Sequence, residues 1–142
     1  MSYQQNPCMQ LLVSFYSNLI NQWYSEAIQN GVDINTHLRN KGKNGILMDM
    51  KKMSNIKQSD FCQCFQQIYK MLNNQPSAAI SAILGLVIPG LPIAKDILDI
   101  IVGSALDYCG FTSQGNKLAL VGIIGLALVA ALALIGLAIK RR

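Results

Sequence analysis

Hydrophobic residues recur at helical spacing in the first part of the chain. Over residues 8–29 they follow one another at intervals of three and four, and the opposite side is polar with Glu26 as its one charge. Asn6-Pro7 supplies an N-cap and a first helical residue, and Asn30-Gly31 supplies a stop. The pattern predicts a long amphipathic helix. Its apolar stripe is Leu12, Phe15, Leu19, Trp23 and Ala27, widened by Tyr16, Ile20 and Tyr24.

Shorter amphipathic segments follow. Asp33 is a candidate N-cap for a helix through Leu38, and the glycines within 41–45 predict a turn or loop. Residues 46–53 form a methionine-rich apolar patch. Ser59 is expected to cap a helix over 59–73, whose apolar face is Phe61, Phe65, Ile68 and Leu72. Because no segment alternates like a strand, we expect an all-α fold that begins with a bundle of short amphipathic helices.

The composition of the chain becomes more apolar after Ser77. Residues 78–94 carry no charge but are interrupted by prolines, so one straight helix cannot continue through them. We expect two helices, 78–88 and 93–107, that form an apolar hairpin. The expected hinge residues are Pro89, Gly90 and Pro92. The predicted division is an amphipathic helical domain at 1–77, the apolar hairpin at 78–107, a polar turn at 108–117 and a transmembrane helix with a basic end at 118–142.

Residues 118–139 indicate a membrane protein. These 22 residues include no charged or strongly polar side chain. At about 1.5 Å per residue they are roughly 33 Å long, enough for a hydrocarbon core of about 30 Å. The alternative is a buried helix of a soluble protein, which rarely stays free of charge over this length. We expect a C-terminal tail anchor, helical over 117–140, with basic interfacial anchors Lys117, Lys140, Arg141 and Arg142.

Two topologies are possible. No apolar core follows residues 1–5, so no secretory signal is expected. If the hairpin also crosses the membrane, the N-terminal domain and Lys140-Arg141-Arg142 share one side. Residues 78–94 would be only about 25 Å long even as an unbroken helix. Charge counting favours this hairpin crossing, because Lys70 and the terminal triplet would then share the cytoplasmic face. Length favours a single span, with 78–107 as a partly buried helical hairpin, and we give length more weight because a few charges cannot lengthen a helix.

Composition narrows the class of function. Charged residues make up 13% of the chain, against roughly 25% in average soluble domains. This composition excludes a disordered chain and a disulfide scaffold and disfavours a freely soluble enzyme. The net charge of +5 is spread thinly, so no specific nucleic-acid binding is expected. His37 is the only histidine and no catalytic motif is present, so we expect no enzyme activity, metal or cofactor.

The four cysteines are Cys8, Cys62, Cys64 and Cys109. Cys62 and Cys64 form a C-x-C pair, whose side chains point to different sides of a helix. That geometry is poor for a single tetrahedral zinc ion. We interpret the cysteines as buried or half-buried thiols, with a disulfide between distant cysteines as the alternative.

Three acids lie in the second apolar helix, Asp96, Asp99 and Asp107. Acids buried within a membrane often mark an ion path. A helix at the membrane interface would instead leave them in water. We expect the interfacial placement.

Small residues mark a packing surface in the anchor. Gly and Ala supply nine of its 22 residues, and small residues let helices approach closely in lipid. The stripe that we expect at the helix–helix contact is Ala119, Gly122, Ala133 and Gly136. We therefore expect a non-enzymatic integral membrane protein whose partners are the lipid bilayer and copies of itself. The class favoured is a structural subunit of a membrane-associated assembly, such as a virion membrane or coat protein or a small subunit of a membrane complex.

The hinged hairpin before a C-terminal anchor resembles Bcl-2-type and translocation-domain proteins, in which a hydrophobic hairpin inserts into the membrane. The segment Leu38-Arg39-Asn40-Lys41-Gly42-Lys43 is similar to the BH3 pattern Leu-x-x-x-Gly-Asp, with Lys43 in place of the aspartate. The Asn-Trp-Gly-Arg motif of that family is missing. This resemblance implies the alternative function, a membrane-permeabilising (pore-forming) or apoptosis-regulating protein.

Overall fold

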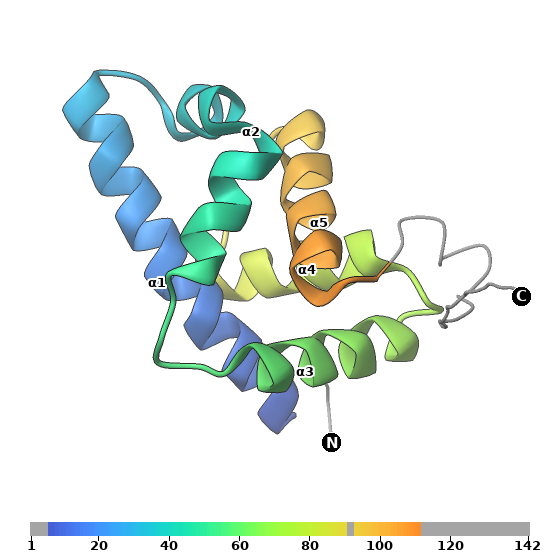
Figure 1. Cartoon of the computed structure of the whole chain (residues 1–142). Coiled ribbons are helices and arrows are strands. Elements are labelled where there is room, and N and C mark those ends of the chain that lie inside the picture. The colour runs from blue at the N-terminus through green and yellow to red at the C-terminus, as the bar shows by residue number, and fades with distance from the viewer. Residues whose placement is uncertain (1–5, 91–92, 112–142) are drawn as a thin grey trace, which may run out of the picture. The chain divides into compact units, whose positions relative to one another are not determined.

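The computed structural model describes residues 6–90 and 93–111, and within them the chain is helical without a strand. The helices are α1 (Pro7–Asn30), α2 (Ile34–Lys51), α3 (Gln58–Met71), α4 (Pro76–Val87) and α5 (Lys95–Cys109) (Figure 1). They pack into one compact unit that ends at Cys109. The all-α class is therefore confirmed for the part of the chain that the structure describes.

The expected anchor lies outside the described residues. The span 118–139, its basic flanking residues and its stripe of small residues are all outside the described residues. The hinge residue Pro92 is outside them too. Within 6–90 and 93–111, none of the helices has both the length and the apolar character needed to cross a bilayer.

Helix α1 confirms the prediction made from its periodicity. Asn6 caps it, with Oδ1 accepting a hydrogen bond of 2.7 Å from the backbone N–H of Cys8, and Pro7 is its first residue. Gly31 ends it in the left-handed conformation, with φ 69°. One side of the helix is buried, as expected from the apolar stripe. Its buried residues are Met9, Leu12, Phe15, Tyr16, Leu19, Ile20, Trp23 and Ala27.

The interruption expected at 41–45 is confirmed, but it is limited to one residue and is not a loop. Helix α2 continues from Ile34 to Lys51 and is interrupted only at Gly42, where φ is 70° and ψ is 178°. Only glycine adopts this conformation without strain, so one residue makes a kink where two glycines suggested a loop. Ile46 and Met50 are buried beyond the kink, and this apolar face keeps the second half of the helix packed on the unit.

Replacing Gly42 by alanine is expected to destabilise the unit by about 1–3 kcal/mol, because the new side chain forces strain at this φ and ψ. No atom lies within 4 Å of the added Cβ, so the cost comes from the backbone and not from a clash. The matched control is Gly85→Ala, in the interior of α4 and equally uncrowded. There alanine should stabilise by about 0.5–1 kcal/mol. Chemical unfolding followed by circular dichroism measures the stability of both variants. Equal effects of the two substitutions would contradict the backbone strain expected at position 42.

The remaining helices lie near their predicted positions. Lys57 rather than Ser59 takes the N-cap position of α3, so the expected cap is wrong by two residues. Pro76 is the first residue of α4. Helix α4 packs on α1 and α3, and α5 packs most extensively on α2. The apolar hairpin segment thus belongs to the same compact unit as the N-terminal helices.

Aromatic rings fill the centre of the unit, where α1, α3 and α5 meet. The ring centroids of Phe15 and Phe61 are 4.6 Å apart, and Tyr108 meets Phe61 edge to face at 5.2 Å. The Tyr16 hydroxyl is buried here without a hydrogen-bond partner. Burial, and to a lesser extent Tyr108, raises the pKa of Tyr16 well above its usual range, so this side chain stays a neutral phenol.

Candidate functional site

All four cysteines are in disulfides, so their interpretation as thiols is wrong. Cys8 of α1 is bonded to Cys64 of α3, with Cα atoms 4.8 Å apart. Cys62 of α3 is bonded to Cys109 at the end of α5, with Cα atoms 5.4 Å apart. The divergence of positions i and i+2 explains the pairing, because each cysteine of the C-x-C pair meets a different helix. We call these two bridges the disulfide frame.

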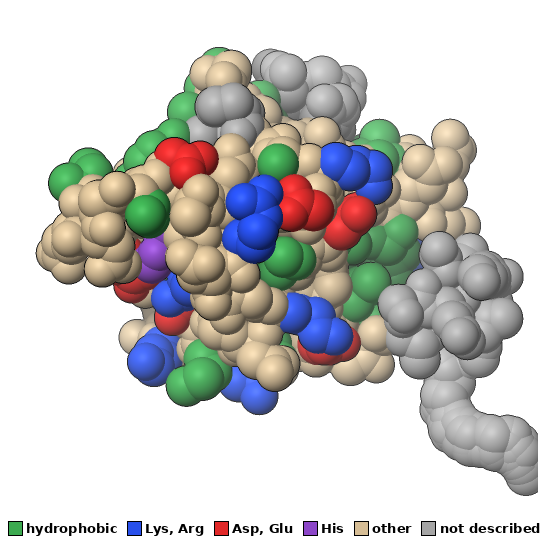
Figure 2. All heavy atoms as spheres, turned by 90° about the horizontal axis from the view of Figure 1, so that it is seen from above, with side chains coloured by type: hydrophobic (Ala, Val, Ile, Leu, Met, Phe, Trp, Pro, Cys, Tyr) green, Lys and Arg blue, Asp and Glu red, His purple; other side chains and the backbone are tan. Residues whose placement is uncertain are grey.

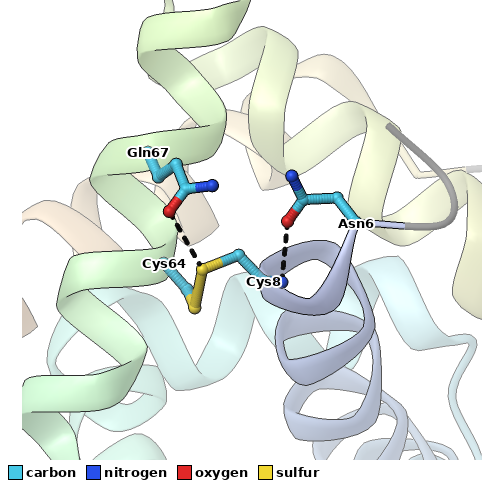
Figure 3. Close-up of a disulfide and its surroundings, with 4 residues drawn as sticks. All are labelled: Asn6, Cys8, Cys64 and Gln67. Atoms are coloured by element: carbon cyan, nitrogen blue, oxygen red, sulfur yellow. Dashed lines mark hydrogen bonds between the residues drawn. A yellow bond between two sulfur atoms is a disulfide. The ribbon is translucent and has the colours of Figure 1, made fainter. Parts of the chain in front are cut away.

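The Cys8–Cys64 bridge lies beside the N-terminus of α1 (Figure 3). Asn6 caps the helix next to it, and the Gln67 carboxamide faces it from α3, with Oε1 3.4 Å from Cys8 Sγ. A disulfide sulfur has no proton to donate, so this approach is a packing contact and not a hydrogen bond. The bridge and the cap together fix the start of α1 on α3.

A polar network joins α1 to both halves of α2. Trp23 Nε1 donates a hydrogen bond of 2.9 Å to Asp49 Oδ2, whose residue is only 7% exposed. Lys41 Nζ lies 2.9 Å from the same Asp49 oxygen and 3.3 Å from Glu26 Oε1. His37 Nε2 is 2.7 Å from that Glu26 oxygen. Since Lys41 precedes the kink and Asp49 follows it, the network holds the bent helix in place.

Hydrogen bonds and opposite charges shift the pKa values of Glu26 and Lys41 in this network. Burial alone would raise the pKa of Glu26, but hydrogen bonds from His37, Gln22 and Lys41 outweigh it and lower that pKa. Burial alone would lower the pKa of Lys41, but Asp49 and Glu26 outweigh it and raise that pKa. Across the described residues, no three metal-binding side chains come together. The arrangement is suited to fastening α1 to both halves of α2.

The unit is expected to lose stability in acid through Glu26. Because the folded state lowers the pKa of Glu26, its stabilisation is complete above the ordinary value of about 4.3 and is lost as pH falls through the folded value. The Glu26→Gln variant should be less stable at neutral pH, and its free energy of unfolding should decrease less than that of the wild type as the pH falls. Urea midpoints between about pH 7 and pH 3 measure this. Parallel curves for the two proteins would contradict it.

The three acids of α5 are in exposed ion pairs. Asp96 pairs with Arg39 and Asp107 with Lys43, so both tie α5 to α2. Asp99 pairs with Lys95 on its own helix. The Arg39 guanidinium lowers the pKa of Asp96. These carboxylates are not buried, so in the described unit they do not form the ion path that was the alternative.

Charged residues are unevenly distributed over the unit. They are dense on α2 and α5, and Figure 2 shows acidic and basic side chains next to one another on this side. Residues 7–25 make up most of α1 and contain no charged side chain. Residues 71–94, which include α4, contain none either. Helices α1 and α4 pack together. We give the name neutral surface to nine of the exposed positions on these two helices: Gln10, Ser14, Asn18, Asn21, Gln22 and Ser25 of α1, and Ser77, Ser81 and Gly85 of α4.

Of the predicted hinge, Pro89 and Gly90 are exposed and lie between α4 and α5, where Gly90 has φ 79°. Sequence reasoning missed the polar network. A signal was present, because Asp49 stands between Ile46 and Met50 on the apolar side of its helix. An acid at such a position requires a buried partner.

The chain matches no protein-family model, no curated protein and no solved structure. What the protein does therefore has to be inferred from its residues and their geometry.

Proposed function

We propose that the protein is a non-enzymatic integral membrane protein that self-associates as a structural subunit of a membrane-associated assembly. The observation that carries the proposal is the charge-free stretch 118–139, which has the length of one membrane crossing and basic residues on both sides. The bilayer and copies of the same chain are the proposed partners. A virion membrane or coat protein and a small subunit of a membrane complex both fit this description.

The neutral surface supports self-association. Charged residues are depleted at the centres of protein interfaces, because each buried charge must be desolvated. Two copies that meet through uncharged Ser, Asn and Gln side chains bring no like charges together. Within the proposed span, the small side chains of Gly122 and Gly136 would allow close helix contact.

The alternative is a membrane-permeabilising protein, and the uncharged α4 with its Pro89-Gly90 link favours it. Insertion of the hairpin requires α5 to leave the unit. The Cys62–Cys109 bridge binds the end of α5 to α3, which opposes that movement. In the BH3-like segment Leu38 is fully buried, so it is not available to a partner.

The mass of the full chain in mild detergent tests the proposal. We expect a large, regular oligomer that does not leak liposomes. Gly122→Leu with Gly136→Leu should reduce its mass by forcing the anchors apart. Asn18→Lys with Ser81→Lys should weaken it by placing charges on the neutral surface. Asn40→Lys, at an exposed position of the charged helix α2, is the matched control and should leave the mass unchanged. A monomer that leaks liposomes would support the alternative.

A further inference from the structure

The disulfide frame includes every cysteine of the chain. Its bridges join three helices, and both pass through one turn of α3. A chain with four thiols in reach of glutathione and thioredoxin is kept reduced, whereas disulfides persist in oxidising compartments. The frame therefore carries information about where this unit is located.

Formation of the frame needs an oxidant. Each bridge forms when two thiols lose two protons and two electrons. A protein disulfide of the thiol-oxidoreductase class can accept them. A cysteine thiolate attacks that disulfide and forms a mixed disulfide with one of its sulfurs. The partner cysteine then attacks the mixed disulfide, so that the internal bond forms and the oxidoreductase leaves as a dithiol. Two such cycles complete the frame.

The charges that flank the proposed span point to the opposite compartment. Lys140, Arg141 and Arg142 follow residue 139 directly, whereas Lys117 alone precedes residue 118, and the flank with more Lys and Arg remains on the cytoplasmic, reducing side. With one crossing, the disulfide frame and the basic triplet lie on opposite sides, as redox chemistry and charge both require. With two crossings they share a side, and the two requirements conflict.

The packing of α5 gives an independent argument against a second crossing. At 15 residues the helix is about 22 Å long, shorter than the hydrocarbon core. Its ion pairs to Arg39 and Lys43 and its bridge to Cys62 also hold it within the unit.

We infer that the unit of α1–α5 is exposed on the oxidising side of its membrane and is a substrate of a thiol oxidoreductase there, with Lys140, Arg141 and Arg142 on the reducing side. This inference rests on the proposed membrane span. It gives that span the orientation opposite to that of a tail anchor, whose N-terminal domain lies on the reducing side, and it names the class of reaction that completes the fold.

Thiol trapping of the full chain tests the redox part. Cells are quenched in acid and the protein is alkylated with a maleimide carrying a polymer before and after reduction. We expect no shift in gel mobility before reduction and a shift of four groups after it. A shift of four groups without reduction would overturn the inference.

Labelling in sealed vesicles tests the direction. Because the native cysteines are bonded, an impermeant maleimide should react only at an introduced thiol. Ser54→Cys, exposed in the link between α2 and α3 and outside the neutral surface, and Arg142→Cys should be labelled from opposite sides of the membrane. Labelling of both from one side would overturn the inference.

Extraction with alkaline carbonate separates this inference from the proposed function. Full release of the wild-type chain would show that it has no span, and both would fail. Retention in the membrane together with free thiols, or with both labels on one side, would overturn only the inference about direction and oxidation.

Discussion

Replacing Cys62 and Cys109 by serine is expected to lower the free energy of unfolding by about 4 kcal/mol. The bridge closes a loop across a sequence separation of 47, and its removal returns that conformational entropy to the unfolded chain. Cys8→Ser with Cys64→Ser should cost nearly the same, because the separation of 56 enters only through its logarithm. Thermal unfolding in mild detergent, followed by circular dichroism, measures both losses.

The two loops overlap only at residues 62–64, so the losses should be nearly additive when all four cysteines are replaced. Reducing agent acting on the wild-type protein should reproduce the quadruple variant and should have no effect on that variant. An unchanged melting temperature after reduction of the wild-type protein would contradict the role given to the frame.

Lys41→Met is expected to cost about 3–5 kcal/mol, because it leaves the buried Asp49 carboxylate without its cation. Trp23 would still donate its hydrogen bond, but a neutral donor does not balance a buried charge. The matched control is Arg39→Met, which breaks the exposed pair with Asp96 and should cost about 0–1 kcal/mol. Urea unfolding of both variants measures the difference.

A second substitution separates charge from packing at this position. Asp49→Asn in the Lys41→Met background removes the unpaired charge and keeps an acceptor for Trp23 Nε1. It should restore part of the lost stability. If the double variant is no more stable than Lys41→Met alone, the loss arises from the lysine stem and its packing, not from the carboxylate.

The features that the sequence predicted well are those that depend on local periodicity. Most of the α1 stripe and the Phe61, Phe65 and Ile68 positions of α3 are buried as expected, because three-and-four spacing places such residues on one side of a helix. Tyr24 and Leu72, at the margins of the two predicted faces, are half-buried. The Gly42 kink was not predictable in the same way. Two glycines within five residues suggest a loop, and only the burial of Ile46 and Met50 keeps the second half helical.

The candidate site depends on contacts between distant residues, and the sequence could not supply these. Four cysteines allow three pairings, and spacing alone does not choose among them. Likewise, the contact between Trp23 and Asp49 joins residues 26 apart in the chain. Only the packing of α1 against α2 brings these two side chains together.

The amphipathic character of α3 also determines which disulfides can form. Cys62 and Cys64 are separated by about 200° around the helix axis, so exchanging their partners would require α3 to turn by about half a revolution. That rotation would expose Phe61 and Phe65 and bury Gln63 and Gln67 in their place. The hydrophobic packing of one helix therefore selects a single disulfide isomer, and a chain that folds before it is oxidised should acquire the correct bridges without later rearrangement.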